Sequence, residues 1–214
     1  MAFEILTSQA AVLATTIVTF ILTLGLSIVI TQRYMRRRSR PLLFWSAGLW
    51  MFAITVFEEI LFAYGIYSTF LIASYLFIVA LLVEALALGS MQLVESRRIR
   101  LTYYGFATIT TLVLLAALVS ESGSIGNIIT EYVVYGNIPL LTALFSTLVT
   151  VPAAVILVAV AAKSYLKRKS SKMLSIIAGV IIVSAAGTLY IVQYPAFLYI
   201  AEFVGILALW YGFI

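Results

Sequence analysis

One pattern occurs twice in this chain, as TTIVTFILTLGLSIVITQRYMRRRSRPLLFWSAG at residues 15–48 and as STLVTVPAAVILVAVAAKSYLKRKSSKMLSIIAG at residues 146–179. Aligned without a gap, 11 of the 34 positions are identical. Each copy contains an apolar segment, a tyrosine (Tyr34 or Tyr165), a basic cluster and a second apolar segment that ends in Ala-Gly. The pattern predicts two helical hairpins of the same design, each turning at its basic cluster.

The composition identifies lipid as the solvent of the fold. Of the 214 residues, 64% are apolar and only 10% are charged, and the mean hydropathy is +1.17. A soluble domain is about half apolar and about a quarter charged. So much apolar surface cannot be hidden in one aqueous core of this size. We therefore predict an all-α integral membrane protein that forms a single domain over residues 1–214.

Apolar segments long enough to cross a bilayer, which takes roughly 20 residues each, recur along the chain. We predict seven transmembrane helices, at about residues 10–31, 41–63, 69–94, 101–120, 138–162, 173–190 and 196–214. Pro152 is expected to kink the fifth helix. For the long connection at residues 121–137, two alternatives stay open. One is an interfacial helix with Ile125, Ile128, Ile129 and Tyr132 on its apolar face, and the other is a plain loop.

Basic residues occur only in alternate connections, which is the pattern of cytoplasmic loops. The N-terminus is therefore predicted outside the cell membrane and the C-terminus inside. The clusters are suited to anionic lipid headgroups, and no continuous basic face for nucleic acid is expected. The residues assigned to headgroup contact and topology are Arg36, Arg37, Arg38, Arg97, Arg98, Lys167, Arg168 and Lys169.

The repeated pattern extends to a third helix in each half. Leu86-Ala87-Leu88 aligns with Leu207-Ala208-Leu209. We predict repeat A over residues 10–94, a linker helix over 101–120 and repeat B over 138–214, with both repeats in the same orientation. This parallel 3+1+3 layout resembles those of the SWEET-type sugar transporters and the microbial rhodopsins. The distributed prolines and Pro-Gln motif of the first group and the retinal-binding lysine of the second have no counterpart, so no functional residue is carried over.

Acidic residues within the predicted spans are the candidate functional groups, because burying a charge in a membrane is costly. No Lys or Arg lies within a predicted span to pair with them. Each carboxyl must therefore be protonated, hydrogen-bonded, hydrated or bound to a cation. The candidates for substrate or ion binding are Glu84, Glu202, Glu58, Glu59, Gln193 and Tyr194.

The absence of Cys, His and Asp leaves little for an enzyme, so we predict no catalytic residues, no metal site and no cofactor. The first functional hypothesis is a transporter or channel whose glutamates bind a proton or cation, with or without a small solute. The alternative is a non-transporting module: a sensor, an assembly factor or a subunit of a membrane complex. The lipid bilayer is the predicted partner, and an oligomer or a complex stays open.

Overall fold

The computed structural model describes residues 9–125, 129–130, 133–134, 138–169, 171–191 and 195–214, and almost all of them are helical. The helices are α2 (Gln9–Arg37), α3 (Arg40–Ala63), α4 (Thr69–Met91), α5 (Arg97–Ser120), α6 (Ser122–Ile125), α7 (Leu140–Arg168), α8 (Ser171–Ile191) and α9 (Pro195–Phe213). Two antiparallel strands of two residues each, β1 (Ile129–Thr130) and β2 (Val133–Val134), pair Ile129 with Val134.

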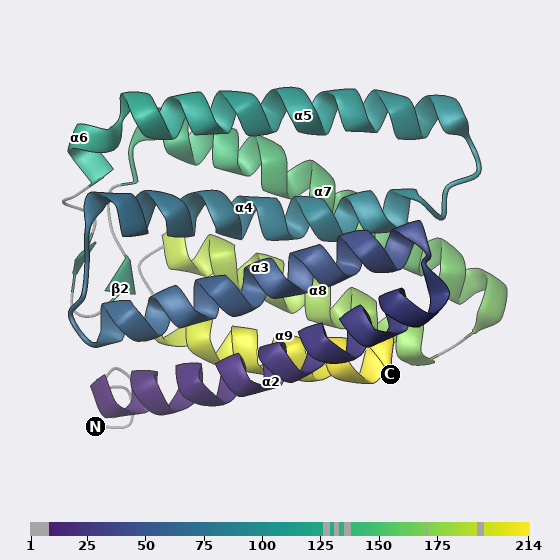
Figure 1. The fold of residues 1–214 in the computed structure, drawn as a ribbon, viewed down its shortest axis with the longest axis horizontal. Helices are drawn as coiled ribbons and strands as arrows, with labels where there is room; N and C mark the ends of the chain where they lie inside the picture. Colours follow the sequence, from purple (N-terminus) through teal and green to yellow (C-terminus); the bar gives the residue numbers. More distant parts are fainter. Residues whose placement is uncertain (1–8, 126–128, 131–132, 135–137, 170, 192–194) are drawn as a thin grey trace.

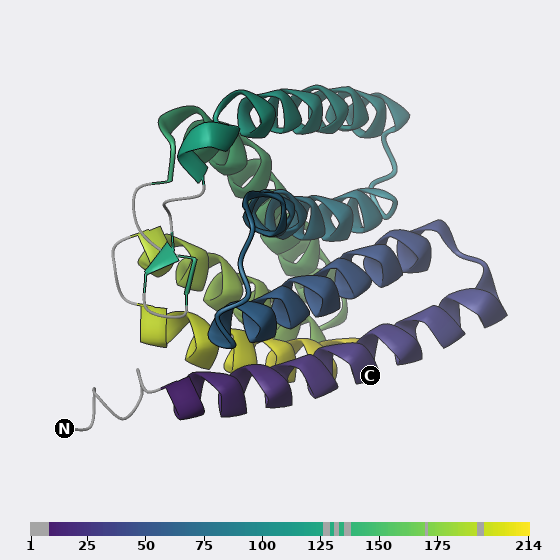
Figure 2. The same ribbon diagram turned by 60° about the vertical axis from the view of Figure 1, so that its left-hand side comes forward.

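The long helices lie side by side, and their connections gather at two opposite ends of the bundle (Figure 1). The connections α2–α3, α4–α5 and α7–α8 lie at one end with the C-terminus; we call it the basic end, because it carries Arg36–Arg40, Arg97–Arg100 and Lys163–Lys172. The opposite end, which we call the hairpin end, holds the α3–α4 turn, α6 and the two strands (Figure 2). The basic clusters therefore share one side of the bundle.

Within the described part of the chain, five helices are long and apolar enough to cross a membrane: α2, α3, α4, α5 and α7. A sixth apolar helix, Leu198–Phe213 within α9, is shorter. Large apolar side chains such as Ile21, Ile109 and Val155 are more than half exposed on the outer surface of the bundle, as expected for side chains that face lipid. The chain thus has the helices of a multi-pass membrane protein, whereas the count of seven spans stays a prediction.

The predicted ends of the first and fifth helices are wrong, because both helices continue through their basic clusters. The sequence predicted ends at residues 31 and 162, whereas α2 ends at Arg37 and α7 at Arg168. Gln, Arg, Lys and Met are good helix formers, so the helix continues where the chain leaves the lipid. The residues that follow, Arg38 and Lys169, leave the helical conformation, with φ angles of 49° and 48°.

Among its described residues, the connection at the hairpin end has a short helix and two short strands instead of the predicted interfacial helix or a plain loop. Helix α6 ends at Ile125, and Ile129 lies in β1, so one helical face through residues 125–132 is wrong. Ile125 is completely buried against the ends of α4 and α5. Ile125 therefore covers the end of the bundle rather than lying on one face of an interfacial helix.

Gly48 allows α3 and α4 to approach each other closely, and Gly179 does the same for α8 and α9. A Cβ atom on Gly48 would lie 3.0 Å from the Leu86 side chain and 3.1 Å from the backbone carbonyl four residues before it. A Cβ atom on Gly179 would lie 3.2 Å from the Leu209 side chain and 3.1 Å from the backbone carbonyl four residues before it. Small residues at such contacts are typical of helix packing in membranes.

A second pair of glycines repeats this correspondence nearer the basic end. A Cβ atom on Gly89 would overlap the ring of Trp45 and lie 3.1 Å from the backbone carbonyl four residues before that tryptophan. A Cβ atom on Gly212 would overlap Ile176 and lie 3.0 Å from the backbone carbonyl four residues before that isoleucine. Gly89 of α4 thus has a counterpart in Gly212 of α9, and each meets the matching position of the preceding helix.

Candidate functional site

Three of the predicted glutamates lie together near the hairpin end of the bundle. Glu58 and Glu59 are in the last turns of α3, and Glu202 is in the second turn of α9. All three side chains are buried, with 5%, 4% and 7% of their surface exposed. The carboxyls of Glu59 and Glu202 face each other in direct contact. We call these three residues the carboxyl cluster.

Helix α4 supplies hydrogen-bond donors to the two glutamates of α3. The Ser74 hydroxyl donates to Glu58 Oε1 over 2.8 Å, and the Tyr75 hydroxyl donates to Glu59 Oε1 over 2.8 Å. The ring of Tyr75 also packs edge-on against Phe62, with 5.5 Å between ring centroids. Consecutive residues of one helix thus bind consecutive residues of its neighbour, so both glutamates point towards α4.

The carboxyl cluster has no basic partner among the described residues. The second oxygens (Oε2) of Glu58, Glu59 and Glu202 are buried and accept no hydrogen bond from a described residue. An isolated buried carboxylate is costly, and two touching carboxylates also repel each other. A proton held between Glu59 and Glu202 removes the repulsion and replaces it with a hydrogen bond. The described residues contain no group of three or more acidic, His or Cys side chains placed to hold a metal ion.

Glu84 lies apart from the carboxyl cluster. It is on α4, nine residues after Tyr75, which corresponds to about 13 Å along the helix axis. Its side chain is 2% exposed, and neither carboxyl oxygen has a hydrogen-bond partner within the described chain. The Tyr103 hydroxyl of α5 lies beside it without forming a regular hydrogen bond. Glu84 and Glu202 therefore belong to different parts of the interior.

A row of buried hydroxyls on α2 was missed in the sequence. Thr16, Thr19, Thr23 and Ser27 are each at most 1% exposed and follow one face of the helix. The hydroxyls of Thr16, Thr23 and Ser27 donate to the carbonyls four residues earlier, over 2.7–2.8 Å, whereas the Thr19 hydroxyl has no partner within the described chain. The helical spacing of these residues was visible in the sequence and would have predicted this hydroxyl row. Helix α2 packs on α3 and α9, the helices that carry the carboxyl cluster.

The remaining predicted residues are at the basic end or outside the described part of the chain. Gln193 and Tyr194 lie outside the described residues. The basic residues lie at helix ends. Arg36 and Arg37 are the last residues of α2, and Arg38 follows them. Arg97 and Arg98 begin α5, whereas Lys167 and Arg168 end α7 and are followed by Lys169. Of Arg168, the structure describes the backbone only.

No protein-family model, curated protein or solved structure matches this chain. The fold and the site alone therefore describe its class. It is a multi-pass helical protein with a buried carboxyl cluster near one end of the bundle, and no described basic residue pairs with that cluster.

Proposed function

We propose that this protein crosses the cell membrane seven times and transfers a proton through the Glu59–Glu202 pair. The contact between these two carboxyls is the observation that supports the proposal. Glu59 belongs to the predicted repeat A and Glu202 to repeat B, so the shared proton would lie between the two halves. Because no described basic residue neutralises the pair, a proton is the simplest group to balance its charge.

Equivalent contacts in α2–α4 and α7–α9 favour two repeats of three helices with α5 between them. Gly48 and Gly179 meet Leu86 and Leu209 in the same way. These contacts favour aligning Leu86 with Leu209 rather than with Leu207, a shift of two residues from the sequence alignment. Two similar units in one orientation provide a way to transport by movement of one unit against the other.

In the proposed mechanism, the proton leaves the pair when the two units move apart. With Glu59 and Glu202 in contact, one proton is held by two oxygens in an apolar surrounding. Separation removes the second acceptor and admits water to one carboxyl, which favours release of the proton. The hydroxyl row of α2 then provides donors and acceptors towards the basic end, where the Thr31 hydroxyl is 2.7 Å from that of Ser46.

Orientation follows from the shared position of the basic clusters. They lie together at one end of the bundle, and basic connections are retained on the cytoplasmic side. We therefore propose that the basic end and the C-terminus face the cytoplasm and that the carboxyl cluster lies nearer the outer surface. The bilayer is the partner in this proposal, which involves neither nucleic acid nor a cofactor.

Proton flux into liposomes tests the proposed function. The purified protein is reconstituted in vesicles that contain a pH-sensitive dye, and a potassium gradient with valinomycin sets the membrane potential. We expect the wild type to acidify or alkalinise the lumen according to the sign of the potential, and Glu59→Gln and Glu202→Gln each to reduce the rate at least about tenfold, because the amide cannot release a proton. Glu95→Gln, in an exposed connection, is the matched control and should transport normally. Equal rates for all four proteins would refute the proposal.

A non-transporting module is the second candidate, and the packing of the interior favours it. Apolar side chains such as Leu26, Leu49, Leu86, Ile206 and Leu209 form a continuous buried group between the carboxyl cluster and the basic end. In a sensor or complex subunit, the Glu59–Glu202 pair would hold the halves together without passing a proton across. Such a protein would give no flux, whereas Glu202→Gln would still alter its stability or its binding to a partner chain.

A further inference from the structure

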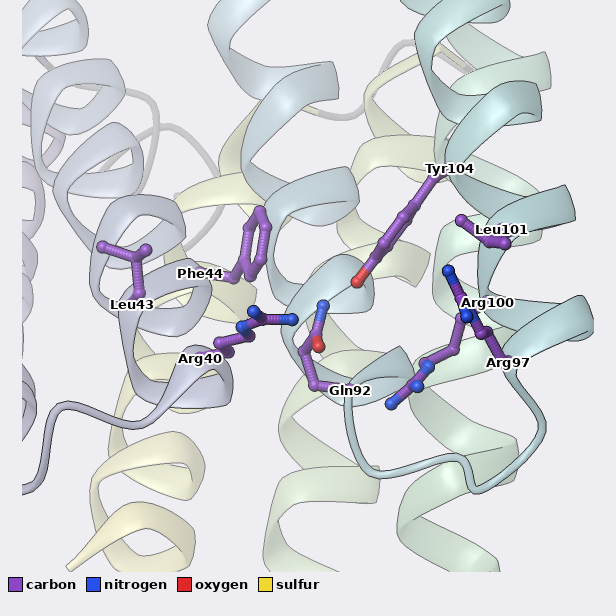
Figure 3. Close-up of a pocket in the computed structure, with 8 residues that line it drawn as sticks. All are labelled: Arg40, Leu43, Phe44, Gln92, Arg97, Arg100, Leu101 and Tyr104. Atoms are coloured by element: carbon purple, nitrogen blue, oxygen red, sulfur yellow. The ribbon is translucent and has the colours of Figure 1, made fainter.

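A cavity of about 450 Å³ opens at the basic end, where α3 and α5 begin and α4 ends (Figure 3). Its volume lies within the range of about 300–1,000 Å³ that is usual for small-molecule sites. It is lined by Arg40, Leu43 and Phe44 of α3, Gln92 at the end of α4, and Arg97, Arg100, Leu101 and Tyr104 of α5. Three arginines from two helices thus share one cavity, and no acidic residue lines it.

The polar groups of this cavity have no partners in the described part of the chain. The side chains of Arg40, Arg97, Arg100 and Gln92 make no hydrogen bond or ion pair with any described residue. The Tyr104 hydroxyl is buried and likewise has no hydrogen-bond partner among the described residues. In Figure 3 it points towards the guanidinium of Arg40 and the amide of Gln92. A buried polar group without a partner is costly, which indicates that a ligand completes its hydrogen bonding.

Guanidinium, amide and hydroxyl donors in one cavity match the oxygens of a phosphate. Arginine binds phosphate through paired N–H donors in a planar fork, and its charge strengthens each hydrogen bond. The lining also has an apolar part: Leu43 and Leu101 are 44% and 56% exposed on helices long and apolar enough to span a membrane. A ligand with a phosphate at one end and acyl chains at the other fits both parts.

We propose that this cavity binds the phosphate of an anionic phospholipid from the leaflet at the basic end. The phosphate contacts Arg40, Arg97 and Arg100, and Tyr104 and Gln92 complete its hydrogen bonds. The acyl chains leave past Leu43 and Leu101 into the bilayer. The lipid thereby links the start of α3 to the start of α5. This site is distinct from general attraction of the basic loops to the membrane surface, because it requires particular residues that line one cavity.

Thermal unfolding in neutral detergent tests the site with defined probes. The wild type is titrated with short-chain phosphatidylglycerol, with phosphatidylcholine and with inorganic phosphate. We expect phosphatidylglycerol to raise the unfolding temperature and the other two to have little effect. Each of Arg40→Gln, Arg97→Gln and Arg100→Gln should weaken the apparent affinity for phosphatidylglycerol about tenfold. Tyr104→Phe, which removes only the hydroxyl, should also weaken it without changing the charge.

Removal of the same charge elsewhere is the control. The triple variant Lys163→Gln, Lys167→Gln, Lys169→Gln lies on another basic segment and should retain the wild-type response. The matching pocket variant combines Arg40→Gln, Arg97→Gln and Arg100→Gln. If the control loses as much affinity as this pocket variant, the lipid is attracted by overall charge rather than by the cavity, and the proposal is wrong. It is also wrong if the pocket variants bind like the wild type. If inorganic phosphate alone stabilises the wild type but not the pocket variants, the phosphate site is supported with a soluble ion as its ligand.

Discussion

Arg38 and Lys169 have the same left-handed backbone at the same place in two helical hairpins. Their φ angles are 49° and 48°, and they are the only described residues other than glycine with a positive φ. The N–H of Arg38 donates to the carbonyl of Tyr34 over 2.7 Å, and that of Lys169 donates to the carbonyl of Tyr165 over 2.6 Å. A left-handed residue with a side chain costs about 1–2 kcal/mol, so its occurrence at both positions points to one shared turn design.

The matched glycines predict matched losses of stability. We expect Gly48→Ala and Gly179→Ala each to lower the free energy of unfolding by about 1–3 kcal/mol, because the new methyl group would press on a backbone carbonyl that cannot move freely. Unfolding in detergent, followed by circular dichroism, measures the change. Gly105→Ala on α5 is the control; it has open space and should stabilise by about 0.5–1 kcal/mol. A harmless Gly48→Ala would show that α3 and α4 are not in close contact.

Glu121 predicts a stability change at acidic pH. Its carboxylate accepts hydrogen bonds from the Leu141 N–H (3.1 Å), the Thr142 N–H (2.8 Å) and the Thr142 hydroxyl (2.7 Å), and so caps the start of α7. Burial acts to raise the pKa of this carboxyl, but the hydrogen bonds from Thr142 and Leu141 outweigh it and lower the pKa below its usual value. The stabilisation that these hydrogen bonds give is therefore complete above the unfolded-state pKa of about 4.3. It is lost as the pH falls through the lower folded-state pKa.

We accordingly expect Glu121→Gln to lower the free energy of unfolding by about 1 kcal/mol at pH 7. The difference from the wild type should shrink as the pH falls below about 4, where the wild-type carboxyl becomes protonated. Thermal unfolding of both proteins at several pH values measures it. A difference that does not depend on pH would mean that the carboxylate charge contributes nothing to the cap.

Loss of the hydrogen bond between Tyr75 and Glu59 should lower stability, whereas loss of a surface tyrosine hydroxyl should not. Tyr75→Phe leaves a buried carboxyl oxygen without its donor and should lower the free energy of unfolding by about 1–3 kcal/mol. Tyr64→Phe, at a residue that is 61% exposed, should leave stability unchanged. Chemical unfolding of the two variants in the same detergent compares them. Equal stability would place the Tyr75 hydroxyl outside the network of the carboxyl cluster.

The proposed orientation predicts opposite labelling of two single-cysteine variants. The chain contains no cysteine, so each variant carries one labelling site. Ile66→Cys lies in the exposed turn at the hairpin end, and Glu95→Cys lies in the exposed connection at the basic end. With a membrane-impermeant maleimide, intact cells should label Ile66→Cys only, and permeabilised cells should label both. Labelling of Glu95→Cys in intact cells would reverse the proposed orientation.

The helical class could be predicted from the sequence because apolar length alone indicates a helix that crosses lipid. Helix ends were harder to predict, since the change from apolar to basic at Thr31 marks where the lipid ends rather than where the helix ends. The backbone of α2 continues to Arg37 because no residue between them disfavours a helix. The same reasoning explains the error at α7.

The individual site glutamates were predictable, but their grouping was not. A charged residue within an apolar segment is visible in any sequence, so Glu58, Glu59, Glu84 and Glu202 were all candidates. The grouping of Glu58, Glu59 and Glu202 depends on where α9 lies relative to α3, which a single sequence does not reveal. Consecutive residues of a helix differ by about 100° in direction, yet Ser74 and Tyr75 of one neighbouring helix bind both Glu58 and Glu59.

The length of α2 and α7 gives the molecule a mechanical property. Each helix has 29 residues, about 43 Å, whereas the hydrocarbon core of a bilayer is about 30 Å thick. The surplus at the basic end is a stiff arm continuous with the buried segment, with charged residues at its tip. Any tilt of α2 or α7 within the lipid therefore displaces the charges at its tip in the water at the basic end.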